Sequence, residues 1–283
     1  MSVDPRPCLI HVGLPRCGST ALQFNTFVRL PDTVYFGKPL PEFSLPMRRL
    51  FLALSNFERW EWQRERPAIE RDLLRPLLAR PGARLVLSEE ELGLGRFDAR
   101  VDRWELARRL HAWFPQAEIL MVVREQQSLL ASIYAHLTTL ERTPELAGRS
   151  YVEWIGDQLA RPWRLLHALR LADAIGPWVE HFGAARVHLR LHEDHRTQPA
   201  AFLASLAPLL GCEPERLLAL SLARARNQRP PDIDTTLPAD LRVALTELYG
   251  PGNLALARAL PLDFARHGYL PDSQPTLQHE VTT

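Results

Sequence analysis

The stretch Ile10-His11-Val12-Gly13-Leu14-Pro15-Arg16-Cys17-Gly18-Ser19-Thr20-Ala21-Leu22-Gln23 decides the fold of this chain. An apolar run from Cys8 to Val12 enters a turn rich in glycine and proline, and the turn opens directly into a helix-like segment. A strand, a glycine-rich turn and a helix in this order are typical of a phosphate-binding loop, in which backbone N–H groups face an anion. We therefore expect this stretch to bind a phosphate.

The spacing of this loop differs from that of nucleotide triphosphatases. Gly13 and Gly18 are followed by Ser19-Thr20, but the lysine expected directly after the second glycine is absent. The cation lies inside the loop instead, at Arg16. Such a loop can hold a phosphate, yet it is poorly arranged to bridge β- and γ-phosphates with magnesium. The sequence therefore favours chemistry other than that of ATP.

Length and composition indicate the broad class. A chain of 283 residues, 46% of them hydrophobic, is long enough for one large α/β domain with a substantial core. We expect a single domain over residues 1–270 and a flexible tail over 271–283. The net charge of +1 gives no reason to expect nucleic acid or an anionic membrane as a partner.

Cysteine usage and the N-terminal segment bear on location. Cys8, Cys17 and Cys212 show no paired spacing, which suits a reducing cytosol. Residues 1–7 contain no long apolar stretch, so we expect neither a secretion signal nor stable membrane insertion. We expect a cytoplasmic protein, and the oligomeric state cannot be read from the sequence.

Short β-like runs alternate with helical stretches, which predicts a mainly parallel sheet flanked by helices. The expected strands are residues 9–13, 33–37, 84–88, 118–123 and 186–191. The expected helices cover residues 19–30, 45–80 (broken by Pro67 and Pro76), 101–114, 126–140, two helices within 151–182, then 199–210, 214–223, 237–248 and 254–265.

Charged and reactive side chains follow these strands. Ligands of open parallel sheets bind beyond the carboxyl ends of the strands. The residues found there are the 14–18 loop, Lys38, Ser88-Glu89, Arg124 and His192-Glu193. Lys38 is the single lysine among 34 basic residues, and arginine cannot imitate its compact ammonium group, so we expect Lys38 to be functional.

Arg124 and Ser132 form a second constellation. Arg124 ends an apolar strand, and Ser132 lies eight residues later, about two helical turns along the next helix. A guanidinium fork and a hydroxyl in one cleft suit a second phosphate. Together with the first loop, this pair implies a ligand with phosphates at two separated positions.

Here the chain resembles the sulfotransferases that use 3′-phosphoadenosine 5′-phosphosulfate. Residues 14–20 resemble their 5′-phosphosulfate loop, and residues 124–132 resemble their 3′-phosphate motif, with arginine and serine at the family's spacing. The phrases Phe36-Gly37-Lys38-Pro39, Leu87-Ser88-Glu89 and 182–187 are similar to bacterial members. Many relatives carry lysine at the position of Arg16, and other branches carry arginine. The resemblance implies a P-loop-like α/β fold with helical insertions.

The resemblance also implies a reaction and its residues. A sulfuryl group moves from the nucleotide to a hydroxyl of a glycan, lipid or small-molecule acceptor, and the scheme needs no metal. Lys38 touches the bridging oxygen or the sulfuryl group. The 5′-phosphosulfate is assigned to Arg16 and the N–H groups of Cys17, Gly18, Ser19 and Thr20, and the 3′-phosphate to Arg124 and Ser132, with Asn227 where relatives close a loop.

An alcohol acceptor requires a general base. Glu89 is the first candidate because related enzymes place a catalytic base or charged residue after the third strand, and Glu42 is the second. His11 is interpreted as a core residue, with support of the loop as the alternative, and the pair His192 and His195 as a polar turn rather than a metal site. Two rival classes remain: a divergent P-loop kinase and a non-catalytic nucleotide-binding relative.

Overall fold

The computed structural model of the chain describes residues 4–38, 45–90, 92, 101–139, 143–161, 165–221 and 233–270. The chain divides into two compact units, which we call the sheet unit and the helical unit. The sheet unit comprises Met1–Val123 and Ala174–Gln228, and the helical unit comprises Arg124–Asp173 and Arg229–Thr283. The expected tail over 271–283 lies outside the described residues, and the single domain over 1–270 stays a prediction.

The sheet unit is built on five parallel strands in the order β2-β3-β1-β4-β5. The strands are β1 (Cys8–His11), β2 (Thr33–Gly37), β3 (Arg84–Ser88), β4 (Glu118–Val123) and β5 (Val187–Leu191). The residues of β4 from Ile119 onward are fully buried, as expected for a strand covered on both faces. The predicted parallel sheet is therefore confirmed, with strand ends shifted by at most two residues.

In this order β1 lies between β3 and β4. The chain forms β2 and β3 on one side of β1 and then crosses over to form β4 and β5 on its other side. Ligand sites of open α/β sheets form beyond the carboxyl ends of strands at such a reversal. The register aligns His11 of β1 with Ser88 of β3, and Ser88 with Gly37 of β2. The residues after these three strands therefore start from one level of the sheet.

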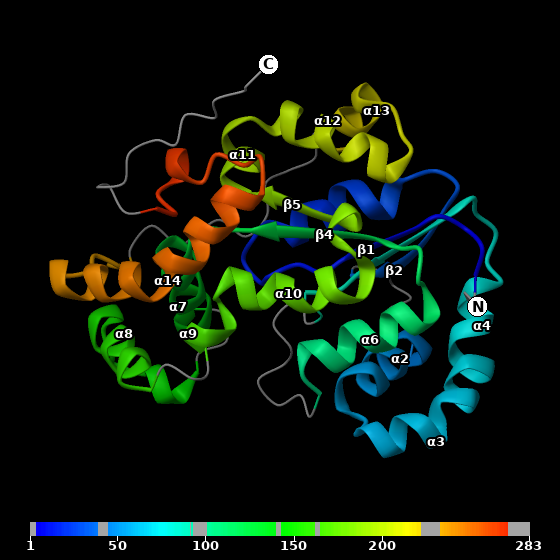
Figure 1. Ribbon diagram of the computed structural model, residues 1–283, viewed down its shortest axis with the longest axis horizontal. Helices are drawn as coiled ribbons and strands as arrows, with labels where there is room; N and C mark the ends of the chain where they lie inside the picture. Colours follow the sequence, from blue (N-terminus) through cyan, green and yellow to red (C-terminus); the bar gives the residue numbers. More distant parts are fainter. Residues whose placement is uncertain are drawn as a thin grey trace. The chain divides into compact units, whose positions relative to one another are not determined.

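Helices flank the sheet, and Figure 1 shows α12 and α13 on one side of it and α6 on the other. Directly after the loop that follows β1, one helical segment runs through α, π and 3-10 turns: α1 (Ser19–Ala21), η1 (Leu22–Thr26) and η2 (Phe27–Arg29). The other helices of this unit are α2 (Leu45–Asn56), α3 (Arg59–Ile69), η3 (Glu70–Leu74), α4 (Arg75–Leu78), α6 (Arg103–Trp113), η5 (Ala184–Arg186), α11 (His192–Thr197), α12 (Pro199–Leu210) and α13 (Pro214–Ser221). Most of α10 (Leu171–Phe182) also belongs to it.

The expected breaks at Pro67 and Pro76 are wrong. Pro67 lies inside α3, where a π-helical turn follows within three residues, and Pro76 lies in the first turn of α4. Proline lacks an N–H, and the first turn of a helix needs none, so Pro76 does not end the helical path. Pro67 does not end it either, because the chain continues into the π-helical turn η3. The actual break separates α2 from α3, where the Glu61 carboxylate accepts a hydrogen bond from the backbone N–H of Glu58.

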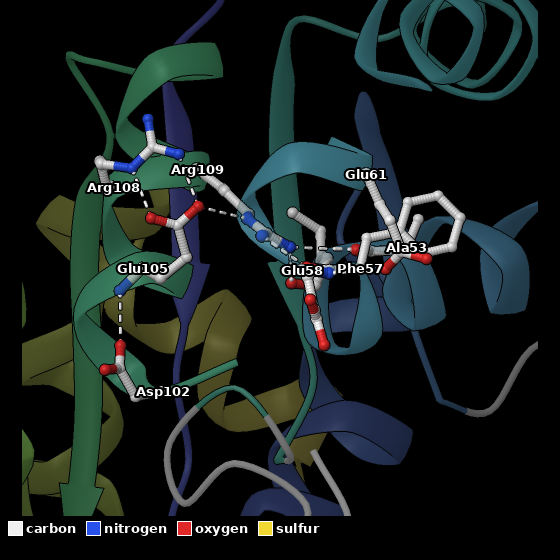
Figure 2. Close-up of polar contacts among 9 residues, drawn as sticks. Ala53, Phe57, Glu58, Glu61, Asp102, Glu105, Arg108 and Arg109 are labelled. Atoms are coloured by element: carbon white, nitrogen blue, oxygen red, sulfur yellow. Dashed lines mark hydrogen bonds and ion pairs between the residues drawn. The ribbon is translucent and has the colours of Figure 1, made fainter. Parts of the chain in front are cut away.

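A buried arginine joins α6 to the end of α2 (Figure 2). The Arg109 guanidinium donates to the carbonyl oxygens of Ala53, Leu54 and Phe57 at 3.2, 2.8 and 2.6 Å. It also pairs with Glu105 at 2.9 Å. The last carbonyls of a helix have no intrahelical donor and carry partial negative charge, so a cation there satisfies both needs.

The helical unit contains α7 (Gln126–Thr139), η4 (Pro144–Leu146), α8 (Tyr151–Ala160), α9 (Leu165–Ala168), α14 (Ala239–Ala259) and η6 (Ala265–His267). The two helices expected over 237–248 and 254–265 are one helix, α14, which continues through Pro251. Its Asn253 side chain exchanges two hydrogen bonds with Gln126 of α7, at 2.8 and 3.0 Å. Over the described ranges, no helix has the length and apolar character needed to span a bilayer.

Candidate active site

The loop after β1 has a strained backbone. Arg16 has a φ of 65°, and Gly18 has a φ of 85°. A residue other than glycine rarely adopts positive φ, and such strain concentrates at ligand-binding turns. Burial lowers the pKa of the half-buried Arg16 guanidinium, and the nearby Glu90 carboxylate opposes this shift. The loop therefore holds a cation in a constrained position near the end of β3.

Cys17 and Ser19 are the buried side chains around Gly18. Cys17 is fully buried, and its Sγ lies 3.7 Å from the Pro15 carbonyl oxygen. The Gly18 carbonyl accepts hydrogen bonds from the N–H groups of Ala21 and Leu22, which starts the helical segment. The first N–H groups of such a segment have no intrahelical acceptor. An anion bound by these N–H groups stays a prediction.

Lys38 and Glu89 lie together. The Lys38 Nζ is 3.1 Å from Glu89 Oε1, and their side chains are 44% and 4% exposed. The contact has the distance of an ion pair without the geometry of a hydrogen bond, and Glu89 Oε1 accepts no hydrogen bond from the described residues. A buried carboxylate that keeps its lone pairs can accept a proton, while the accessible ammonium can meet an anion.

Two residues of β2 support this pair. The Tyr35 hydroxyl donates to the Lys38 carbonyl oxygen at 2.5 Å, and burial raises the pKa of Tyr35. A Cβ at Gly37 would lie 2.4 Å from the Ser88 carbonyl oxygen. Only glycine allows β2 to approach the end of β3 this closely. Gly37 therefore fixes the backbone position from which the Lys38 side chain extends.

Behind the loop, three buried side chains from three elements are in contact. His11 Nδ1 lies 2.8 Å from Ser88 Oγ, and Gln23 Nε2 lies 3.1 Å from the same oxygen. Burial lowers the pKa of His11 to about 3, so the imidazole is neutral at pH 7. His11 is thus a core residue, as predicted, but one that touches the loop region.

The sequence analysis missed the role of His192 and His195 as neighbours of the loop. A Cβ at Gly18 would lie 3.1 Å from Nδ1 of each histidine. His195 stacks on Phe202, with ring centroids 4.5 Å apart, and burial lowers its pKa. The position of the two histidines directly after β5 was the sequence signal that could have predicted this place next to the loop. Among the described residues, no group of three or more potential ligands could hold a metal ion.

The helical unit carries the second constellation. Arg124 Nε donates to Ser128 Oγ at 2.8 Å, and the N–H of Ser128 donates to Glu125 at 2.7 Å. Ser132 is 5% exposed on α7. A shared phosphate between Arg124 and Ser132 stays a prediction. The predicted residues Glu42 and Asn227 lie outside the described residues.

The helical unit also contains a cavity of about 580 Å³. It lies at the end of α7, between this helix, residues 146–152 and residues 233–236. The hydroxyls of Thr138 and Thr139 donate to carbonyl oxygens of α7, so their lone pairs are the groups left for a ligand. Its size is that of a pocket for a small organic molecule.

Comparison with known proteins identifies the fold. No family profile and no curated sequence matches the chain. Among solved structures, a sulfotransferase from Alicyclobacillus acidocaldarius is similar, with a TM-score of 0.60 at 19% identity over 93% of this chain and 99% of that one. Mouse sulfotransferase SULT7A1 complexed with PAP gives 0.56 at 12% identity over 92% and 88%. The chain has the sulfotransferase fold.

Proposed function

We propose that this protein is a sulfotransferase that transfers a sulfuryl group from 3′-phosphoadenosine 5′-phosphosulfate to an acceptor hydroxyl. The observation that carries the proposal is the Lys38–Glu89 pair, 3.1 Å apart at the sheet edge where the loop after β1 also begins. A buried carboxylate and an accessible ammonium are the groups that such a transfer needs. The sulfotransferase fold and the nucleotide named with the mouse structure support it.

In this proposal each group has one role. The acceptor oxygen attacks sulfur, the bond from sulfur to the bridging oxygen breaks, and the electron pair goes to the departing 5′-phosphate. Glu89 takes the acceptor's proton, and Lys38 stabilises the charge that develops on the bridging oxygen. Glu42 is the second candidate for the base. The binding residues are Arg16 with the N–H groups of Cys17, Gly18, Ser19 and Thr20 for the 5′-phosphosulfate, and Arg124, Ser132 and Asn227 for the 3′-phosphate.

The acceptor belongs to the glycans, lipids or small molecules that carry a free hydroxyl. We propose that the cavity of the helical unit binds a small organic molecule that carries free hydroxyls. The lone pairs of Thr138 and Thr139 would accept hydrogen bonds from ligand hydroxyls, and Tyr134 and Tyr151 add aromatic surface. Sugar-like molecules present both hydroxyl donors and apolar C–H faces, so the lining of this cavity favours them.

Two measurements test the function. Adenosine 3′,5′-bisphosphate should raise the melting temperature without magnesium, and ATP with magnesium should not; the reverse result would favour a kinase. Transfer of radiolabelled sulfuryl groups to a panel of acceptors, with glycosides included, should then give a product. Tight bisphosphate binding with no transfer to any acceptor class would indicate a non-catalytic relative.

A further inference from the structure

The Tyr35 side chain reaches along β2 to the backbone of Lys38. Its hydroxyl donates to the Lys38 carbonyl oxygen at 2.5 Å, and the residue is 6% exposed. In a strand, residues i and i+2 share a face, so Tyr35 and Gly37 point to the same side of β2. A Cβ at Gly37 would lie 2.5 Å from the Tyr35 hydroxyl oxygen. Glycine at this position therefore leaves the space through which the phenol reaches Lys38.

A buried network sets the direction of this hydrogen bond. A carbonyl only accepts, so the Tyr35 hydrogen is committed to Lys38, and towards Ser88 the Tyr35 oxygen accepts. The hydrogen bond with Ser88 opposes the rise that burial causes in the pKa of Tyr35, as a hydrogen donated to the phenol oxygen must. The Ser88 oxygen then accepts from Gln23 Nε2 at 3.1 Å and from His11 Nδ1 at 2.8 Å. Buried hydrogen bonds that point in one direction strengthen one another, so the hydroxyl that holds Lys38 is itself held.

Lys38 depends on such a contact because the strand ladder ends before it. The last residue of β2 is Gly37, which aligns with Ser88 of β3, and Lys38 is the next residue. Its ammonium lies 3.1 Å from Glu89 Oε1, although the Lys38 side chain is 44% exposed and that of Glu89 only 4%. Lysine has a flexible four-carbon stem. An exposed stem keeps its ammonium beside a buried carboxylate only if the backbone of the lysine is fixed.

We propose that Tyr35 is a positioning residue for Lys38. The Tyr35 hydroxyl holds the Lys38 carbonyl, and the ammonium consequently lies beside Glu89 at the edge of the sheet where the proposed transfer takes place. A displacement of about 1 Å in a reacting group can lower a rate by about 10²-fold, so this placement matters for turnover. The placement of Lys38 needs no ligand, and only its effect on transfer rests on the proposed function.

Lysine NMR tests the placement without nucleotide or acceptor. Lys38 is the single lysine of the chain, so labelling with ¹³C-lysine gives one ε-methylene signal to follow. Tyr35→Phe keeps the ring and removes the hydroxyl, so it should shift this signal and raise the mobility of the methylene in ¹³C relaxation. Glu89→Gln should shift the signal in the wild type and shift it less in the Tyr35→Phe background. An ε-methylene signal that is the same in the wild type and in Tyr35→Phe overturns the inference.

Two further variants complete this test. Ser88→Ala keeps the Tyr35 hydroxyl but removes its donor, so the lysine signal should move in the same direction by a smaller amount. If Tyr35→Phe does not fold, an unchanged signal in Ser88→Ala overturns the inference instead. Tyr249→Phe is the matched control, since the Tyr249 hydroxyl is buried and has no hydrogen-bond partner among the described residues. It should leave the signal unchanged, and a shift as large as that of Tyr35→Phe also overturns the inference.

Radiolabelled transfer then tests how Tyr35 acts. Tyr35→Phe should lower kcat by a factor of about 10 and leave the KM of the acceptor and the bisphosphate affinity within a factor of about 3. Added to Lys38→Gln, the same substitution should lower kcat by less than about twofold, because a residue that acts through Lys38 has nothing left to position. Equal factors in the two backgrounds overturn the inference. If the lysine signal responds as expected but no acceptor is sulfated, Tyr35 still positions Lys38 and the proposed function is wrong.

Discussion

Replacement of Glu89 by glutamine separates a base from a merely buried carboxylate. Glutamine keeps the shape of the side chain but cannot take a proton from the acceptor. A positioned general base contributes about 10²- to 10⁴-fold to a rate, so kcat should fall by about that factor. Because Glu89 is 4% exposed, water cannot readily replace it at this position.

The same substitution removes the negative charge of Glu89 beside the Lys38 ammonium, which should not weaken nucleotide binding. Bisphosphate affinity, measured by calorimetry, should stay within a factor of about 3 of the wild type, while radiolabelled transfer collapses. Glu118→Gln is the control, since this carboxylate begins β4 at the opposite edge of the sheet and pairs with His188. Turnover of Glu89→Gln within about threefold of the wild type would remove Glu89 from the mechanism and favour Glu42.

Three further predictions concern stability. Arg109→Met leaves the three carbonyls without their cation while Glu105 keeps Arg108, so urea unfolding should show a loss of about 3–5 kcal/mol, and a loss below about 1 kcal/mol contradicts the capping role. Gly37→Ala places a Cβ 2.4 Å from a backbone oxygen and should lower both the melting temperature and turnover, whereas Gly156→Ala in α8 meets nothing within 4 Å and should raise the melting temperature or leave it unchanged. Since burial lowers the pKa of His11 to about 3, the unfolded chain binds the extra proton between that value and about 6.5, and stability falls as pH falls through this window. Between pH 7.5 and 5 the wild type should therefore lose about 2 kcal/mol more than His11→Asn, and equal losses refute the assignment.

The strands were predictable from the sequence because most are short apolar runs, and β2 to β5 are each followed directly by a polar or charged residue. Parallel strands must end at one edge, so the neighbourhood of Lys38 and Glu89 follows from their positions after β2 and β3. The distance between the Lys38 and Glu89 side chains depends on the register of β2 against β3. The positions at which the strands end in the sequence do not give that register.

The errors have a different origin. Pro67 suggested a break because local rules assign a cost to proline inside a helix, but a π-helical turn follows it. The long helix α14 passes Pro251 and Gly252, while the Asn253–Gln126 amide pair holds this part of α14 against α7. The course of α14 depends on a partner distant in sequence, and periodicity within one window contains no information about it.

The register itself links the two halves of the candidate site. Gly37, Ser88 and His11 form one row across three strands, and the next residue of β2 and of β3 is a member of the ion pair. Ser88 holds His11 through its side chain and is joined to Glu89 through its backbone. A shift of β3 by one residue would therefore separate Glu89 from Lys38 and also remove the hydroxyl that orients His11. The proposed anion binding at the loop and the proposed proton transfer at Glu89 thus depend on one strand register, in which a Cβ at position 37 would lie 2.4 Å from the Ser88 carbonyl oxygen.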